Sequence, residues 1–244
     1  MSPEGKQKIQ LALLAALVIA SIRAGVIFYQ RHEDRVEAEK QKRAKDLGYS
    51  NPDYYVNPKR LHPFDLKSAR ELTKQPVWVK EGYHYTYYRY DPASKRVDFT
   101  HDAGLLGPIE KLNIIDVIVA NHPDSREQRQ VMAVFEKDGK SYAVPIGYEA
   151  NSEYTIYSDD IFFIEDPHEL YKHWPADVWQ GIEQHQVKQG MNELQADFAV
   201  GMGMPDSGAS SLEKTVRYAN GGKPLVVVFH DGKAVEVTQA PAGG

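Results

Sequence analysis

The residues that come closest to a catalytic pattern lie between positions 166 and 173. His168, Glu169 and His173 resemble the start of the His-Glu-x-x-His pattern of zinc hydrolases, in which two imidazoles four residues apart hold the metal. Here the two histidines are five residues apart, and on a helix this separates their rings by about 140°. No third ligand follows at a recognisable spacing. We keep a metal-dependent hydrolase as an alternative function for this chain. It would require a local distortion of this helix that brings the two imidazoles together.

A structural interpretation accounts for the same residues. Asp166 suits a helix N-cap, Pro167 suits the first helical position, and Glu169 falls where it can complete a capping box. Asp159 and Asp160 have the character of residues at a strand end. The chain also lacks the nucleophile elbow, the P-loop and the dinucleotide fingerprint. We therefore predict a protein that is not an enzyme, with no catalytic residues, no metal and no cofactor.

Composition narrows the classes of function. The chain has 244 residues, of which 42% are hydrophobic, enough for one large or two small domains. The formal net charge of −5 argues against nucleic acid as a partner, because domains that bind it are usually basic. The absence of cysteine excludes disulfides, thiolate zinc sites, thiol catalysis and cysteine lipidation.

The N-terminal region predicts attachment to a membrane. After a tail over residues 1–8, residues 9–29 form a mostly apolar run of the length that spans a bilayer as a helix. Arg23 interrupts this run near its far end, where the side chain can reach the interface. We predict a single uncleaved transmembrane anchor. The alternative is a signal peptide cleaved after Ala20, which would release a secreted, soluble binding protein.

Two arguments about the orientation of this anchor disagree. Six lysines and arginines between positions 31 and 45 follow the apolar run, and the positive-inside rule then places the rest of the chain in the cytoplasm. The short leader with Lys6 and Lys8 instead has the form of a secretory signal. We predict that the C-terminal domains are periplasmic or otherwise extracytoplasmic.

The remaining chain predicts an α+β protein. Residues 30–64 form a charged helical stalk and a linker rich in proline and tyrosine. In residues 65–165, a short helix capped by Asp65 precedes an antiparallel β-barrel or sandwich, SH3-like in strand number and spacing. Asp138-Gly139 marks a hairpin turn. The expected strands are 77–80, 83–90, 96–100, 112–120, 130–137, 141–147 and 154–165.

Five tyrosines crowd into the second of these strands. Tyr83, Tyr85 and Tyr87 would share one face of the strand, and Tyr88 and Tyr90 would lie on the other. An exposed aromatic strip can bind a peptide, a glycan or a partner strand. The simpler interpretation is that tyrosine is a good strand former, half-buried with its hydroxyl at the rim. These five are the only binding residues that the sequence suggests.

Residues 166–239 predict a second α+β domain, in which helices precede a three-stranded meander. The first helices span 167–173 and 175–188, and another begins at Asn192 with Gln195 at the capping-box position. Residues 240–244 are expected to form a disordered tail. The expected strands are 213–219, 224–230 and 234–239.

Three short motifs in this region resemble one family. They are Gly190-Met191-Asn192-Glu193-Leu194-Gln195, Gly203-Met204-Pro205 and Val228-Phe229-His230-Asp231-Gly232-Lys233. Over residues 187–237 the chain is thereby similar to the SmpA/OmlA (BamE-like) small envelope domain. The resemblance implies a non-enzymatic scaffold or interaction protein of the bacterial cell envelope, with protein partners in a larger membrane complex. The lipidated cysteine of the lipoprotein members is missing, and the transmembrane anchor could replace it.

Overall fold

The computed structural model describes residues 52–122, 128–208, 210 and 213–240, together with Arg23, Arg31 and Arg35. Apart from these three arginines, the predicted anchor and the stalk up to residue 51 lie outside the described residues, as do positions 241–244 of the predicted tail. Among the described residues, no helix is long and apolar enough to cross a membrane. The chain divides into residues 1–51 and 52–244, and the fold below is that of the second unit.

This unit begins with a short 3₁₀ helix and an extended segment. Helix η1 (Pro52–Tyr55) is followed by extended chain up to helix α2 (Leu66–Ala69), which continues as the 3₁₀ helix η2 (Arg70–Lys74). The Asp65 carboxylate accepts a hydrogen bond from the Ser68 N–H, and the Ser68 hydroxyl accepts one from the Asp65 N–H. The predicted N-cap at Asp65 is therefore confirmed.

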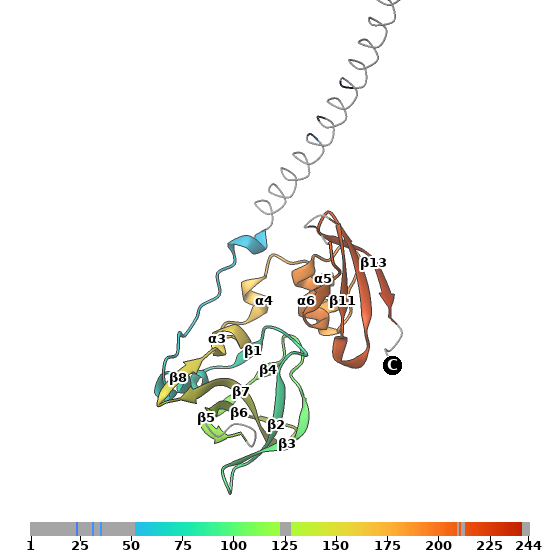
Figure 1. Ribbon diagram of the computed structural model, residues 1–244. Helices are drawn as coiled ribbons and strands as arrows, with labels where there is room; N and C mark the ends of the chain where they lie inside the picture. Colours follow the sequence, from blue (N-terminus) through green and yellow to red (C-terminus); the bar gives the residue numbers. More distant parts are fainter. Residues whose placement is uncertain are drawn as a thin grey trace, which may run out of the picture. The chain divides into compact units, whose positions relative to one another are not determined.

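Two antiparallel sheets follow (Figure 1). The larger has the strand order β3-β2-β7-β6-β5, with β8 paired to β7, and the smaller has the order β4-β1-β9. Asp138 and Gly139 have φ of +52° and +70°, as the predicted hairpin turn between β6 and β7 requires. Helix α3 (Ser158–Ile161) separates the last two strands. The strand bounds are β1 (Val77–Val79), β2 (Thr86–Asp91), β3 (Arg96–Leu105), β4 (Lys111–Leu112), β5 (Ile114–Asn121), β6 (Gln128–Lys137), β7 (Lys140–Ala150), β8 (Glu153–Ile156) and β9 (Phe162–Phe163).

Three of the strand predictions need correction. The strand expected at 83–90 begins only at Thr86, because Tyr83 has φ of +60°, which extended backbone does not adopt. The strand expected at 112–120 is divided at Asn113 into β4 and β5, which belong to different sheets. The strand expected at 154–165 contains α3 between β8 and β9.

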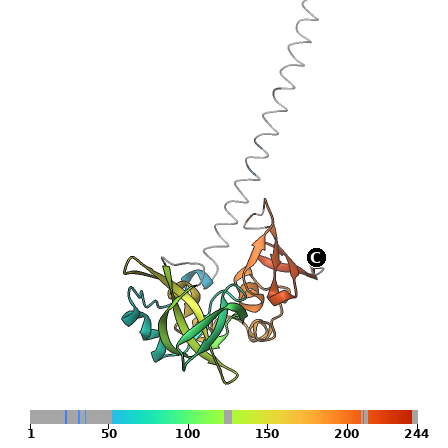
Figure 2. The same ribbon diagram turned by 60° about the horizontal axis from the view of Figure 1, so that its bottom comes forward.

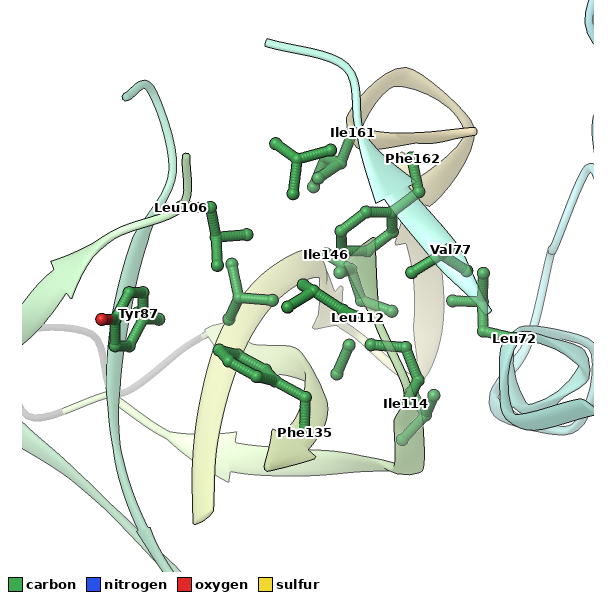
Figure 3. Close-up of a cluster of buried hydrophobic side chains, with 14 of the residues drawn as sticks. Leu72, Val77, Tyr87, Leu106, Leu112, Ile114, Phe135, Ile146, Ile161 and Phe162 are labelled. Carbon is green, nitrogen blue, oxygen red and sulfur yellow. The ribbon is translucent and has the colours of Figure 1, made fainter. Parts of the chain in front are cut away.

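A first hydrophobic core fills the space between these sheets. Figure 3 shows its side chains pointing toward one another, with Tyr87 and Phe135 entering from β2 and β6. The α2–η2 segment closes the cluster through Leu72. Other buried members are Val77, Val79, Leu106, Leu112, Ile114, Ile146, Ile161 and Phe162.

Strands β1 and β9 contribute to two cores. Successive residues of a strand point to opposite faces of the sheet. Accordingly, Val77, Val79 and Phe162 belong to the first core, whereas Trp78 and Phe163 belong to a second. The small sheet thus connects the β region to the helices that follow it.

The C-terminal region consists of three helices and a four-stranded sheet, which share the second core. The helices are α4 (Pro167–Leu170), α5 (Ala176–Glu183) and α6 (Glu193–Val200). The sheet has the order β10-β11-β12-β13 and is drawn in orange to red in Figure 2. Its strands are β10 (Gly203–Pro205), β11 (Glu213–Tyr218), β12 (Leu225–His230) and β13 (Lys233–Gln239), with the 3₁₀ helix η3 (Asn220–Gly222) before β12.

Two features of this region differ from the sequence-based expectation. The three expected strands correspond to β11, β12 and β13, but β10 adds a fourth strand, hidden in the sequence because glycine and proline are poor strand formers. The helices expected at 167–173 and 175–188 end earlier, at Leu170 and Glu183. The predicted capping box of α6 is confirmed, since Asn192 and Gln195 each accept a hydrogen bond from the other's backbone N–H.

Candidate functional site

The two histidines of the pattern that resembles a zinc hydrolase have different partners. Helix α4 ends before His173, so the helical spacing does not apply to this pair. The His168 ring stacks on Trp179 with centroids 4.0 Å apart, and its Nδ1 lies 3.1 Å from Asp166 Oδ1. The Nε2 of His173 lies 2.6 Å from Asp53 Oδ1. Among the described residues, no group of three or more His, Asp or Glu side chains is arranged to hold a metal ion.

The residues around His168 start a helix, as the structural interpretation predicts. The Asp166 carboxylate accepts a hydrogen bond from the backbone N–H of His168 at 2.9 Å, and Pro167 begins the helix. The predicted capping box with Glu169 is wrong, because the carboxylate bonds to the second helical residue and not to the third. Glu169 itself is exposed in the first turn.

The polar centre of this region is Asp53 in η1. Only 6% of its side chain is exposed. Its Oδ1 accepts hydrogen bonds from His173 Nε2 and Trp174 Nε1, both at 2.6 Å, and its Oδ2 accepts one from Asn192 Nδ2 at 2.7 Å. A buried carboxylate requires such donors to compensate for its lost hydration. This arrangement joins η1 to the connection between α4 and α5 and to the start of α6.

Asn192 has two roles at the start of α6. Its side-chain oxygen caps the helix through the N–H of Gln195, and its amide nitrogen donates to Asp53. Serine, threonine and aspartate also cap helices, but none of them offers an amide donor. The Asn192 side chain therefore links helix capping to the position of η1.

We call residues 52–65, which comprise η1 and the extended chain before α2, the strap. The strap contacts two acidic side chains near the end of the β region, Asp159 and Glu165. Glu165 accepts a hydrogen bond from the Lys59 N–H at 2.8 Å, and this bond lowers the pKa of the Glu165 carboxyl. The Asp159 carboxylate accepts the N–H groups of Leu61 and His62 at 3.0 and 2.7 Å. The Asp159 carboxylate is thus used to hold the strap.

Asp53→Asn should lower the free energy of unfolding by about 1–2 kcal/mol, because an amide has one acceptor oxygen in place of two and leaves at least one of the three donors without an acceptor. The measurement is chemical denaturation followed by tryptophan fluorescence, to which Trp174 contributes directly. Asp177→Asn, on the exposed start of α5, is the matched control and should change the stability by no more than a few tenths of a kcal/mol. Equal stabilities of the two variants would contradict a structural role for the Asp53 contacts.

The structure distributes the five predicted tyrosines over three places. Tyr83 precedes β2 and packs against the backbone of the glycines at 201 and 221. Tyr87 is 8% exposed and lies in the first core, with Tyr85 packed against its edge. Tyr88 and Tyr90 are half-buried on the opposite face of the sheet. The five side chains therefore do not form one exposed strip, since strand alternation and the turn at Tyr83 separate them.

Tyr85 and Tyr88 nevertheless meet other aromatic residues at the surface. The ladder between β2 and β7 contains only the pairs Tyr88–Ala143 and Arg89–Tyr142. Pro145 follows in β7, and proline cannot donate a hydrogen bond to a ladder. A groove of about 350 Å³ lies beside this position, and we call it the aromatic groove. Its lining residues are His84, Tyr85, Thr86, Tyr88, Pro145 and Tyr157.

The four-stranded sheet presents its second face to solvent. Met204, Val226 and Val228 lie on this outer face of the C-terminal sheet, opposite Val216 and Val227, which pack into the second core. The side chain of Met204 is 75% exposed, whereas those of Val226 and Val228 are half-buried. A hollow of about 640 Å³ is lined in part by Val228 and by Thr215 and Val235.

Helix α6, which shares the second core with the inner face of this sheet, carries a partly buried acid, Asp197. Burial, together with the neighbouring charge of Glu193, raises the pKa of the Asp197 carboxyl to about 7. Lys214 of β11 forms an ion pair with Glu193. The Tyr218 hydroxyl and the backbone N–H of Gly203 interact with the Asp197 carboxylate and lower its pKa, but burial outweighs them.

Comparison with known protein families, with curated proteins and with solved structures finds no match to this chain.

Proposed function

We propose that this chain is a membrane-anchored, non-enzymatic interaction or scaffold protein of the bacterial cell envelope. In this proposal the C-terminal region, residues 166–239, docks on a larger membrane complex. The observation that carries the proposal is the outer face of the C-terminal sheet, where Met204 is 75% exposed on β10. On the same face, Val226 and Val228 are half-buried on β12, with Arg217 of β11 between Met204 and Val226. Apolar side chains gathered on a rigid surface are typical of protein interfaces.

The similarity of residues 187–237 to the SmpA/OmlA (BamE-like) domain supports the same role. Two of the motifs that carry this resemblance fall on the capping box at Asn192–Gln195 and on the turn at Asp231-Gly232. In the proposal, the apolar segment 9–29 replaces the lipid anchor of the lipoprotein members. We also propose that residues 65–165 form an SH3-like β region and that both domains are periplasmic.

The full-length protein should stay in membranes washed with carbonate and, after mild solubilisation, migrate in native gels well above its own 27.6 kDa. Val228→Glu and Met204→Glu should release it from the larger species, because a carboxylate in an apolar interface loses its hydration without gaining a partner. Ile115→Glu is the matched control, since Ile115 is 50% exposed on β5, outside this sheet. Its migration should not change.

Retention of both variants in the larger species would exclude the outer face as the docking surface. Migration of the wild-type protein at its own mass would contradict docking altogether. Extraction by carbonate, with a mature N-terminus at Ser21 found by mass spectrometry, would replace the anchored protein by a secreted one. Denaturation of each purified variant shows whether it is folded.

A further inference from the structure

We infer that the aromatic groove between β2 and β7 binds an extended, basic, proline-containing peptide segment. The groove belongs to the β region, so this inference goes beyond the docking surface proposed for the C-terminal sheet. Three tyrosines line this groove. Tyr88 lies in β2, Tyr85 immediately precedes this strand, and Tyr157 immediately follows β8. Pro145, Thr86 and the exposed His84 complete the lining of the groove.

The rings suit proline residues. Proline packs its flat, apolar ring against an aromatic face, and a proline-rich segment is already extended, so binding orders it at little entropic expense. Tyr85, Tyr88 and Tyr157 are all half-buried, so part of each side chain remains accessible to a ligand. The hydroxyls of Tyr88 and Tyr157 can donate hydrogen bonds to the carbonyls of such a segment, which form no bonds within the segment itself.

The walls of the groove are held in place by the fold. The Tyr85 hydroxyl donates a hydrogen bond to Glu81 at 3.3 Å, and its ring meets that of His84 edge to face at 5.1 Å. The Tyr88 ring packs against Phe99 with centroids 5.1 Å apart. The backbone N–H of Tyr157 bonds to a β7 carbonyl at 2.9 Å. Walls held in this way need little reorganisation when a ligand enters.

The backbone at one wall favours a peptide over a glycan. The Tyr85 carbonyl accepts a hydrogen bond from the Leu106 N–H, so this residue directs its backbone groups away from β7. Because backbone groups alternate in direction along a strand, the N–H and C=O of the next residue, Thr86, point toward β7. Thr86 lines the groove and lies beyond the last residue pair that joins β2 to β7. An extended peptide carries donors and acceptors at the spacing of such an edge.

The charges near the groove favour a basic ligand. Burial raises the pKa of Tyr85, and the neighbouring carboxylates of Glu81 and Asp160 raise it further. Burial and Asp102 act in the same direction on Tyr88. Glu81 is placed at the groove by its hydrogen bond with the Tyr85 hydroxyl, and Asp160 and Asp102 are the other acidic neighbours of the two tyrosines. The Lys80 ammonium, which also lies near Asp160, donates to the backbone carbonyl of Asp159. Arginine or lysine beside the prolines would complement the carboxylates.

The test uses the full-length protein in detergent micelles and a fluorescent peptide made of repeated Pro-Pro-Arg triplets, with binding measured by anisotropy. Tyr88→Ala and Tyr157→Ala should each weaken binding about tenfold, a typical loss for an aromatic contact residue. Tyr55→Ala, at a site 70% exposed in η1, is the matched control and should leave binding unchanged. A peptide of Pro-Pro-Glu triplets should bind at least about tenfold more weakly, because its charge is opposite.

His84→Lys provides a second variant in case an alanine variant does not fold, since it changes only an exposed side chain at the rim. The added charge should weaken binding of the arginine peptide several-fold, and more so at low salt. Equal affinity for both peptides, or unchanged binding by the tyrosine and His84 variants, would overturn the inference. Displacement of the peptide by a soluble chito-oligosaccharide would assign the groove to a glycan. Val228→Glu should bind the peptide normally, which separates this test from the docking proposal.

Discussion

Phe198→Ala should lower the free energy of unfolding by about 3–5 kcal/mol, the largest effect that we expect from a single substitution in this chain. Phe198 is 2% exposed on α6. Its ring lies 5.8 Å from that of Phe163 and 5.2 Å from those of Tyr171 and Trp174, measured between centroids. The substitution removes these contacts and leaves a cavity at the centre of the second core. Chemical denaturation of the full-length protein in detergent, followed by fluorescence, measures the change.

Phe64→Ala is the matched control for this substitution. Phe64 lies in the strap and is 75% exposed, so its removal creates no cavity and should change the stability by less than about 0.5 kcal/mol. The comparison tests the placement of α6, because a helix turned another way would leave Phe198 partly in solvent. A Phe198→Ala variant as stable as the parent would show that the second core is not assembled around this ring.

Asp197→Asn should raise the free energy of unfolding at pH 8 by about 2–4 kcal/mol and leave it almost unchanged at pH 4. The pKa of the Asp197 carboxyl is about 7 in the folded protein and near the ordinary aspartate value of 3.8 in the unfolded chain. Between these values the folded state binds a proton that the unfolded state does not. Stability therefore falls as the pH rises from about 4 to about 7, and remains at the lower level above that range. Asparagine stays neutral and is free of this loss.

The measurement is denaturation of both proteins at pH 4, 6 and 8, and the quantity of interest is the difference between them at each pH. Contributions from all other titrating groups are common to both proteins and cancel in this difference. Asp138→Asn is the control, because Asp138 is exposed in the β6–β7 turn and asparagine also accepts its positive φ. If Asp197→Asn gives the same difference at all three pH values, the carboxyl does not titrate in this range.

Short-range features of the fold could be predicted from the sequence. The N-caps Asp65, Asp166 and Asn192 were predicted correctly, as was the turn at Asp138-Gly139. Each depends on hydrogen bonds or backbone angles within four residues, so the side chains that decide it are neighbours in the chain. The strands β11, β12 and β13 also follow from local alternation and turn residues.

Features that depend on distant residues could not be predicted. Pro145 and Tyr157 carry no signal that connects them to Tyr85, and the aromatic groove exists only because β2 and β7 separate beside them. The division of the expected strand at Asn113 could not be predicted either, because it depends on the pairing of β4 and β5 with strands of different sheets. Side-chain periodicity predicts the secondary structure of one segment at a time, and it does not identify the strand with which that segment pairs.

The histidines at 168 and 173 show both sides of this distinction. The sequence by itself determined that they are five residues apart and that Asp166 and Pro167 begin a helix there, because capping is local. Only the tertiary structure decided that α4 stops after Leu170, that one ring stacks on Trp179, and that the other bonds to Asp53. Asp53 is 120 residues away from His173 in the chain, and only folding can bring a buried carboxylate to its donors over such a separation.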